Sequence, residues 1–208
     1  MPTRFTLLEH VTLPPLKKVA VISDIHGNAA ALRAVLEQLD REGGFGLICC
    51  LGDMITNGPD TNEVLELLMD RDDVKIILGN HEIFVLDVYH GIDNGLPEKK
   101  RLQHRWVAEQ LRPQYQTMLE KLPLSMLIEA SGYRLYLIHY HMDEELRYKD
   151  IGKERPTVQS LNEMYRGMRA DAICFGHDHN PLALRSQPDG KLYINPGALG
   201  CCPRPAAR

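Results

Sequence analysis

The chain has no long hydrophobic run, no N-terminal export signal and no surplus of basic residues among its 208 amino acids. No stretch approaches the ~18 consecutive apolar residues of a membrane-spanning helix. The N-terminal segment lacks the continuous apolar core and the small-residue cleavage site that a secretory signal requires. We therefore expect a protein that neither crosses a membrane nor is exported.

Basic residues are few and scattered. Lysine and arginine number 24 against 28 aspartate and glutamate residues, which gives a net charge of −4. A protein that follows a nucleic-acid backbone needs a stripe of positive charge, and the sequence has none. A nuclease acting on DNA or RNA is therefore disfavoured. Contact with a single nucleotide stays open, because it depends on a local site and not on the overall charge.

Cysteine is also scarce, with five residues and no Cys-x-x-Cys pair. Cys49, Cys50 and Cys174 lie in apolar, strand-like runs, where small buried thiols are common. We expect neither a disulfide framework nor a cysteine-based zinc site. This use of cysteine suits a reducing compartment, and the cytoplasm is the predicted location.

Short β-branched runs alternate with helical patterns in the first part of the chain. Asn28 stands where a helix N-cap is expected, before apolar residues at helical spacing. The predicted strands are Lys18–Ser23, Leu47–Leu51 and Val74–Leu78, and the predicted helices are Ala29–Leu39 and Asn62–Met69. This alternation implies βαβ crossovers and parallel strands, whose carboxyl ends carry ligand-binding loops.

The second part of the chain mixes helices and hairpins. After a polar break from His90 to Arg101, a helix is predicted from Leu102 to Glu120, with Trp106 in the core. Later elements are strands at Ser125–Ala130 and Tyr133–Ile138 joined by a Ser131-Gly132 hairpin, a helix at Thr157–Met168, a strand at Ala172–Phe175, and two short strands around a turn at Pro188–Gly190. No repeat or linker interrupts the pattern. We predict one domain over residues 1–208, with a leader strand or loop at 1–17 and a tail at 201–208.

Five short polar segments follow the strand-like runs and gather aspartate, asparagine and histidine. They are Asp24-Ile25-His26, Gly52-Asp53, Gly79-Asn80-His81-Glu82, His139 and Gly176-His177-Asp178-His179. Oxygen and imidazole donors without thiolate suit Mn²⁺, Fe, Zn²⁺ or Ni²⁺ better than Ca²⁺, and suit Mg²⁺ less well. The combination predicts a site for two divalent ions, with Mn²⁺ preferred.

Seven of these side chains are candidate metal ligands: Asp24, His26, Asp53, Asn80, His139, His177 and His179. The two carboxylate oxygens of Asp53 could bridge two ions. Ions about 3.5–4 Å apart could activate a bridging hydroxide and hold phosphoryl oxygens for in-line displacement. His81, beside Asn80, is the candidate to stabilise or protonate the leaving oxygen.

The order of these motifs, completed by Asn195-Pro196-Gly197, resembles that of the calcineurin-like metallophosphoesterase superfamily. The resemblance extends from Asp24 to Gly197, nearly the whole chain. The stretch from Gly52 to Leu68 is similar to a bacterial and archaeal branch of small phosphodiesterases and phosphatases. That branch carries a Gly-Pro-x-x-x-Glu-Val continuation, seen here at Gly58-Pro59 and Glu63-Val64.

The resemblance implies an α/β fold, namely a four-layer α/β/β/α sandwich of two mixed β-sheets with the site at the loop edge. It implies that one ion is held by Asp24, His26, Asp53 and His179. The second ion is implied to be held by Asp53, Asn80, His139 and His177. His81 matches the catalytic histidine of the superfamily.

Three departures from the family pattern leave alternatives open. The family has His-Gly where this chain reads His139-Tyr140-His141, so the ligand is His139 or His141, with His139 favoured. Asn57 stands near the place of an arginine in the protein-phosphatase branch, which disfavours a Ser/Thr phosphatase. Relatives continue past the Asn-Pro-Gly motif with further strands. We therefore expect either a missing edge strand or a chain cut short after Gly200.

The sequence therefore predicts a dimetal phosphoesterase that hydrolyses small phosphomonoesters or phosphodiesters, nucleotides and dinucleotides included. The alternatives are a phosphoprotein phosphatase and a catalytically weak metal-binding scaffold on the same fold. Candidate substrate contacts are Asn28, Asn57, Tyr140 and His141, with Arg147 also near the rim. Three histidines outside the motifs, namely His10, His90 and His104, are expected to be solvated or to serve in packing.

Overall fold

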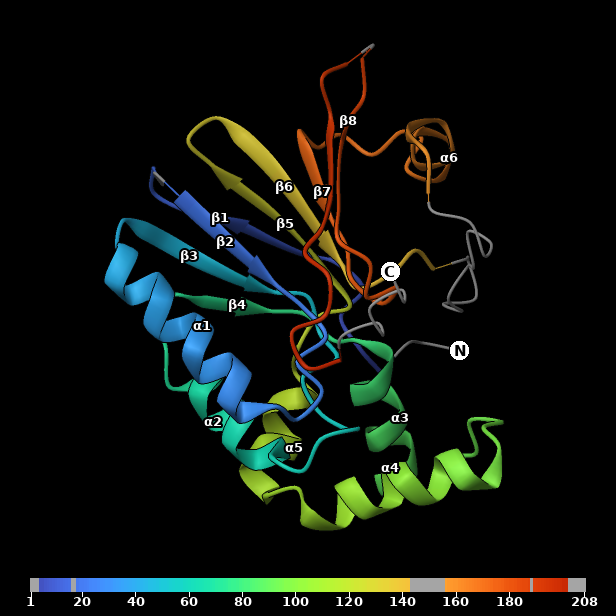
Figure 1. Cartoon of the computed structure of the whole chain (residues 1–208). Coiled ribbons are helices and arrows are strands. Elements are labelled where there is room, and N and C mark those ends of the chain that lie inside the picture. Colours follow the sequence, from blue (N-terminus) through green and yellow to red (C-terminus); the bar gives the residue numbers. More distant parts are fainter. Residues whose placement is uncertain (1–3, 16–17, 143–155, 188, 202–208) are drawn as a thin grey trace, which may run out of the picture.

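Two β-sheets stacked face to face, with helices on their outer sides, form the framework of the chain in a computed structural model (Figure 1). The structure describes residues 4–15, 18–142, 156–187 and 189–201. None of the helices in these ranges is both long and apolar enough to cross a membrane.

The first sheet is three-stranded and parallel, in the order β2 (Lys18–Ile22), β3 (Phe45–Cys50) and β4 (Val74–Ile76). Helices α1 (Ala29–Glu42) and α2 (Thr61–Met69) make the crossovers between these strands. The predicted N-cap is confirmed, because the Asn28 side chain accepts a hydrogen bond of 3.0 Å from the Ala31 amide. Parallel pairing brings the ends of β2, β3 and β4 to one edge of the molecule.

The second sheet is six-stranded and mixed. Its order is β1 (Glu9–Thr12), β5 (Ser125–Ala130), β6 (Tyr133–Ile138), β7 (Ala172–Cys174), β9 (Leu192–Asn195) and β8 (Leu182–Arg185). The predicted hairpin between β5 and β6 is confirmed, and Ser131 and Gly132 both adopt the positive φ that its tight turn requires. Because β6 and β7 are parallel, their ends lie at one edge of this sheet.

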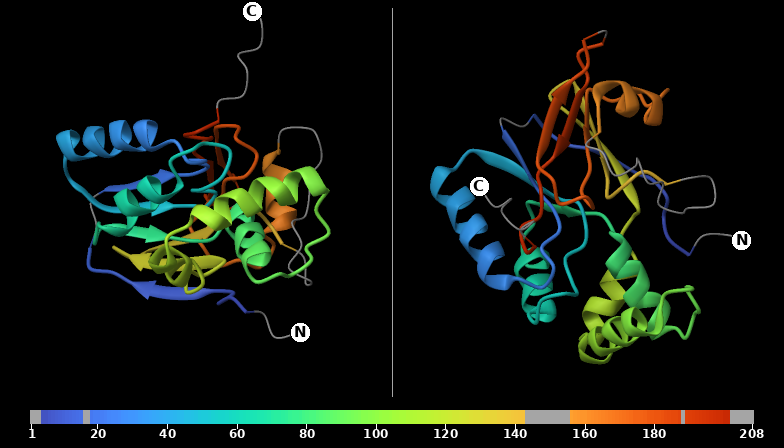
Figure 2. Two further views of the ribbon diagram at one scale, coloured as in Figure 1. Left: turned by 90° about the horizontal axis from the view of Figure 1, so that it is seen from below. Right: turned by 45° about the vertical axis from the view of Figure 1, so that its right-hand side comes forward.

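Three apolar clusters hold the layers together. Between the sheets, Leu47, Cys49, Leu51 and Ile77 pack against Met126, Ile128, Leu137 and Cys174. Helices α1 and α2 cover the outer face of the three-stranded sheet, and α6 (Val158–Met164) covers that of the six-stranded sheet (Figure 2). Each fully buried aliphatic side chain contributes about 1.5–3 kcal/mol. The α/β fold with two sheets is therefore confirmed.

The helical region between β4 and β5 differs from its prediction. It contains α3 (Asn80–Tyr89), α4 (Glu98–Gln110) and α5 (Pro113–Leu119). The predicted loop up to Arg101 is wrong at its end, because Glu98 to Arg101 form the first turn of α4. The single helix predicted up to Glu120 is wrong too, because Pro113 has no amide hydrogen and starts a new helix.

Two smaller expectations were also wrong. Trp106 is 49% exposed on α4 and does not belong to the core. The last helix ends at Met164 instead of Met168. Gly167 lies just beyond it with a φ of 86°, a conformation that does not continue a helix.

Candidate metal centre

The predicted ligands lie in tight turns at the ends of strands. Five of them, Asp24, His26, Asp53, His177 and His179, have a positive φ between 48° and 70°. The part of the chain that the structure describes has only three other non-glycine residues with positive φ. Such backbone strain costs of order 1–3 kcal/mol per residue and gathers at functional sites. The turns break the strand alternation, so that Asp24 and His26 point toward the same place.

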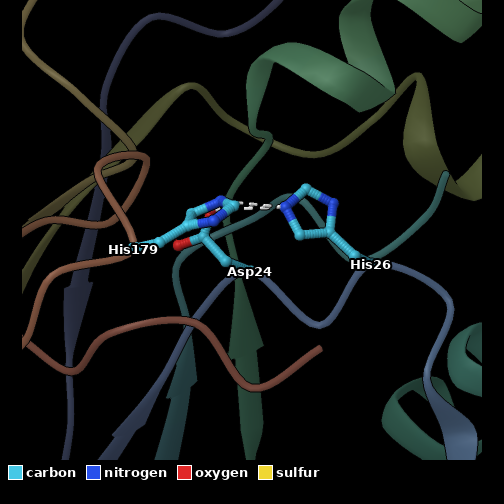
Figure 3. Close-up of side chains that lie close together, drawn as sticks. All are labelled: Asp24, His26 and His179. Atoms are coloured by element: carbon cyan, nitrogen blue, oxygen red, sulfur yellow. Dashed lines mark hydrogen bonds and ion pairs between the residues drawn. The ribbon is translucent and has the colours of Figure 1, made fainter. Parts of the chain in front are cut away.

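The first cluster consists of Asp24, His26 and His179 (Figure 3). Asp24 Oδ1 lies 3.2 Å from His179 Nε2 and 3.8 Å from His26 Nε2. The two Nε2 atoms are 3.0 Å apart. Donor atoms about 2.1 Å from a common ion are about 3.0 Å apart at right angles and about 3.4 Å apart at the tetrahedral angle. The two distances that involve His179 fall within this range, and the 3.8 Å between Asp24 and His26 lies somewhat beyond it. The three donors can therefore share one divalent ion after a small adjustment of Asp24 or His26.

The second cluster lies around the other side of Asp53. His139 Nε2 is 3.3 Å from Asp53 Oδ2, and His177 Nδ1 is 2.8 Å from Asn80 Oδ1. The donor atoms of Asp53, His139 and His177 all lie within 4.8 Å of one another, and so do those of His26, Asp53 and His81. Asp53 thus belongs to groups on both sides, as a residue that bridges two ions must.

Outer contacts fix the direction of these ligands. The Nδ1–H of buried His139 donates to the Leu51 carbonyl at 2.7 Å, which turns its Nε2 toward Asp53. The other oxygen of Asp24, Oδ2, accepts hydrogen bonds from the Ser23 hydroxyl at 2.6 Å and from the His177 amide at 3.1 Å. The metal-facing atoms are therefore held in place by the protein itself.

Glu82 connects the two loops that carry Asp53 and Asn80. Its buried carboxylate accepts four backbone hydrogen bonds, from the amides of Asp53, Met54, Ile55 and Gly79 at 2.8, 2.8, 3.2 and 2.8 Å. Burial and the Asp53 charge raise the pKa of Glu82 to about 7, whereas the backbone donors favour its ionised form. Glu82 holds the shape of the site and does not point into either cluster.

The charges of the site favour a cation. Burial opposes the ionisation of Asp24 and Asp53, but His179 lowers the pKa of Asp24, and His139 lowers that of Asp53. Burial lowers the pKa of His26, and it lowers the pKa of His177 to about 4. Ionised carboxylates and neutral imidazoles are the forms that bind metal. Asp53 overcomes burial at His139 and raises the pKa of that imidazole to about 9, so a positive charge is favoured there.

His81 lies beside both clusters. Its Nε2 is 4.0 Å from Asp53 Oδ2, and its ring centre is 5.2 Å from that of His26. Burial lowers the pKa of His81 to about 4, and its side chain keeps 14% exposure toward solvent. His81 is therefore the group best placed to reach a substrate that contacts the clusters.

The four predicted substrate contacts lie in different surroundings. Asn28 and Asn57 line a hollow of about 300 Å³ beside His26. The amide of Asn57 lies 3.1 Å from His26 Nδ1, so Asn57 also orients a predicted ligand. Tyr140 is buried, with its ring centre 4.9 Å from that of His177. Arg147 lies outside the described residues.

The two candidate ligands His139 and His141 lie in different surroundings. His141 packs against the ring of Tyr165, with centroids 5.6 Å apart, and lines a different cavity, of about 480 Å³. It belongs to none of the candidate metal groups found among the described residues. The structure thus puts His139, and not His141, beside Asp53.

Sequence reasoning missed two residues that touch His81. Thr56 Oγ1 and His104 Nε2 lie 2.7 and 3.0 Å from His81 Nδ1. Thr56 comes three residues after Asp53, so its closeness in the chain to the Gly-Asp motif could have marked it as a candidate site residue. His104 lies on α4, 23 residues from His81, and no spacing links the two.

Known proteins and a family model match most of the chain. The model of the calcineurin-like phosphoesterase superfamily domain matches residues 18–207. An uncharacterized protein, MJ0912, of Methanocaldococcus jannaschii is 28% identical over 195 residues, which cover 88% of this chain and 76% of that protein.

Two relatives with named activities match over shorter stretches. A zinc-dependent endopolyphosphatase of Saccharomyces cerevisiae is 38% identical over 95 residues, or 43% of this chain and 28% of that protein. A symmetrical bis(5'-nucleosyl)-tetraphosphatase of an Enterobacter species is 33% identical over 81 residues, or 38% of this chain and 29% of that protein. The matched stretches thus span less than a third of both relatives.

Solved structures share the fold. Hypothetical protein PH1004 of Pyrococcus horikoshii superposes with a TM-score of 0.72 at 17% identity, covering 90% of this chain and 78% of that one. A metallophosphoesterase of Sphaerobacter thermophilus has a TM-score of 0.67 at 23% identity, covering 91% and 79%. At such identities the likeness concerns the architecture alone.

Proposed function

The chain belongs to the calcineurin-like phosphoesterase superfamily, and on that premise we propose that it hydrolyses small phosphate monoesters or diesters with the help of two divalent ions. The observation that carries the proposal is the pair of donor clusters, with Asp53 in the second cluster and also grouped with His26 of the first, and with His81 beside them. This arrangement suits the hydrolysis of a phosphoester, because bound ions would place positive charge around the phosphoryl oxygens while His81 supplies a proton to the leaving group.

In this proposal one ion would be held by Asp24, His26, Asp53 and His179, and the other by Asp53, Asn80, His139 and His177. When bound, the ions supply Lewis acidity and lower the pKa of water. Nitrogen and oxygen donors without thiolate favour Mn²⁺, with Fe, Zn²⁺ and Ni²⁺ as the other candidates.

The chain's own residues supply the rest of the chemistry. His81 Nε2 faces the clusters and exchanges a proton with the leaving oxygen. Burial keeps free His81 neutral, and the negative charge of a bound phosphate favours its imidazolium form. Asn28 and Asn57 line the hollow beside His26, and we assign the leaving group of the substrate to this hollow.

We propose a small phosphorylated molecule as the substrate, with nucleotides and dinucleotides first among the candidates. Support comes from the relative named as a dinucleoside tetraphosphatase. Asn57, near the position of the arginine in the protein-phosphatase branch, disfavours phosphoproteins. The free buried thiols of Cys49, Cys50 and Cys174 suit the reducing cytoplasm as the place of action.

The test is a substrate panel assayed with protein loaded with Mn²⁺, Zn²⁺ or Ni²⁺. Aryl phosphate monoesters and diesters, dinucleoside polyphosphates and a phosphopeptide distinguish the substrate classes. We expect hydrolysis of at least one small ester. A protein that binds its metals but cleaves no member of the panel contradicts the proposal and favours a scaffold.

The His81→Gln variant tests the proton carrier. We expect kcat to fall by about 10²–10⁴-fold, the usual contribution of general acid–base catalysis, while the metal content stays that of the wild type. His90→Gln is the matched control, because His90 is an exposed histidine that pairs with Glu120 and lies at the opposite end of α3 from Asn80. Wild-type kcat in the His81→Gln variant would sink the assignment.

A further inference from the structure

A buried histidine outside the metal motifs, His104 on α4, contacts the ring of His81. His104 is 1% exposed, and its Nε2 lies 3.0 Å from His81 Nδ1. On the other side of its ring, Nδ1 lies 2.7 Å from the Lys100 carbonyl oxygen, one helical turn earlier. Because a carbonyl oxygen only accepts, the His104 proton is on Nδ1 and its Nε2 presents a lone pair. Burial lowers the pKa of His104 and supports this neutral form.

The lone pair of His104 decides where His81 carries its proton. Thr56 Oγ1 also lies 2.7 Å from His81 Nδ1, but a hydroxyl can donate or accept, so Thr56 leaves both tautomers open. Two nitrogen lone pairs facing each other at 3.0 Å would repel. An attractive contact with His104 therefore requires a proton on His81 Nδ1. The opposite ring nitrogen, Nε2, then faces the metal clusters without a proton in the neutral form.

The residues and helices around His104 hold its ring in position against His81. Its ring packs edge-on against Phe84, with centroids 5.5 Å apart. The end of α4 is tied to α2, because the Asn62 amide group donates to the Gln110 carbonyl at 2.8 Å and its oxygen accepts from the Arg112 amide at 2.9 Å. The helix thus presents His104 from a fixed position.

We propose that His104 is a positioning residue that fixes the tautomer and orientation of His81, so that proton exchange with the substrate takes place at Nε2. The inference rests on the proposed catalytic role of His81. When His81 is protonated, its Nδ1–H still donates to His104, so the same hydrogen bond supports both states of the proton carrier.

Two substitutions distinguish the contribution of the His104 hydrogen bond from the contribution of its packing. His104→Leu fills the space without an acceptor, and we expect kcat to fall by about 10- to 100-fold with little change in KM, as for other orienting groups around a site. His104→Gln supplies an acceptor oxygen and is expected to recover most of kcat. Arg105→Gln, exposed on the same helix, is the control that should match the wild type. Metal content and unfolding midpoints establish that each variant is folded.

Wild-type kcat in His104→Leu overturns the proposal. Folded His104→Gln with a loss as large as that of His104→Leu overturns it too, because the acceptor would then be irrelevant.

A spectroscopic test is independent of activity. Ring nitrogen-15 spectra of zinc-loaded protein, with the His81 signals assigned from the His81→Gln variant, report which nitrogen carries the proton. We expect Nδ1 in the wild type and a shift toward Nε2 in His104→Leu. A wild-type His81 protonated on Nε2 contradicts the inference, even if the enzyme is active. A protein that hydrolyses no phosphoester but shows the Nδ1–H tautomer contradicts the proposed function. The contact with His104 would then fix the tautomer of His81 without serving proton exchange, which overturns the catalytic part of the inference.

Discussion

At the scale of single residues, the site depends on groups that touch no proposed ligand atom. The Leu51 carbonyl contacts His139, His104 contacts His81, and Glu82 accepts hydrogen bonds from four backbone amides of the loops around Asp53 and Asn80. A donor that is merely near an ion binds it weakly unless its direction is fixed. The outer groups therefore determine whether the aspartates and histidines form a site at all.

Glu82→Gln tests the most connected of these groups. The substitution keeps the size of the side chain but replaces one accepting oxygen with an NH₂ group that faces backbone donors. We expect the free energy of unfolding to fall by about 3 kcal/mol, the cost of breaking a buried charged network. At roughly 2–4 °C per kcal/mol for a protein of this size, the midpoint should drop by about 6–12 °C in thermal unfolding.

The control for this variant is Glu37→Gln on the exposed face of α1. This substitution removes the same charge at a side chain for which no hydrogen bond is described, and it should leave the unfolding midpoint unchanged. Equal midpoints for the two variants would show that the four hydrogen bonds of Glu82 do not stabilise the fold.

At the scale of elements, the loops that follow β3 and β4 approach each other so closely that a glycine is required at position 79. Gly79 precedes Asn80, a proposed ligand, at the start of α3. A Cβ atom added there would lie 2.2 Å from Asp53 Oδ1 and 2.4 Å from the Asp53 amide nitrogen. The loops after β3 and β4 therefore meet in a space that admits no side chain at Gly79.

Gly79→Ala should displace the Asp53 carboxylate. We expect metal affinity to fall by about 10- to 100-fold, as when other groups around a metal are disturbed, and activity to fall with it. Metal titration of the apo protein measures the effect. Gly91→Ala is the control: the backbone there has a φ of +68° but nothing lies within 4 Å of the added Cβ. Gly91→Ala should cost about 1–2 kcal/mol of stability, because its Cβ strains a left-handed backbone, and it should leave metal affinity unchanged. An unchanged affinity in Gly79→Ala would mean that the loops yield without moving Asp53.

The helices and strands also show which parts of the fold local sequence patterns can predict. Apolar runs predicted β3, β5 and β6 because most of their side chains are buried or half-buried, and Asn28 marked the start of α1 because it offers a cap. The start of α4 was missed, since Glu98 to Arg101 have the charges of a surface loop. That turn is helical because the buried face of α4, with His104 and Val107, docks against the body of the protein.

At the scale of the whole molecule, the site exists because the two sheets are stacked. Asp24 follows a strand of the first sheet and His179 follows a strand of the second, yet their side-chain atoms lie 3.2 Å apart. His26 and His179 are 153 residues apart in the chain. A metal ion bound between them would therefore link the two layers.

Metal removal should consequently destabilise the whole fold. Metal at 100 times its dissociation constant stabilises the native state by about 2.7 kcal/mol. At roughly 2–4 °C per kcal/mol, chelation should lower the unfolding midpoint by about 5–10 °C, and added Mn²⁺ should restore it. In Asp53→Asn we expect most of this shift to disappear. The exposed Asp72→Asn variant should keep it. A full metal-dependent shift in Asp53→Asn would place the ions elsewhere.

The sequence by itself determined which residues can carry the chemistry. Side-chain type and the position of each motif after an apolar strand identified Asp24, Asp53, Asn80 and the histidines, because ligand preference and strand patterning are local properties. The tertiary structure alone decided which histidine of the pair His139 and His141 faces Asp53, and that His104 contacts His81. Both depend on how distant layers pack, since a turn or a docked helix sets the direction of a side chain, and no spacing along the chain encodes that direction.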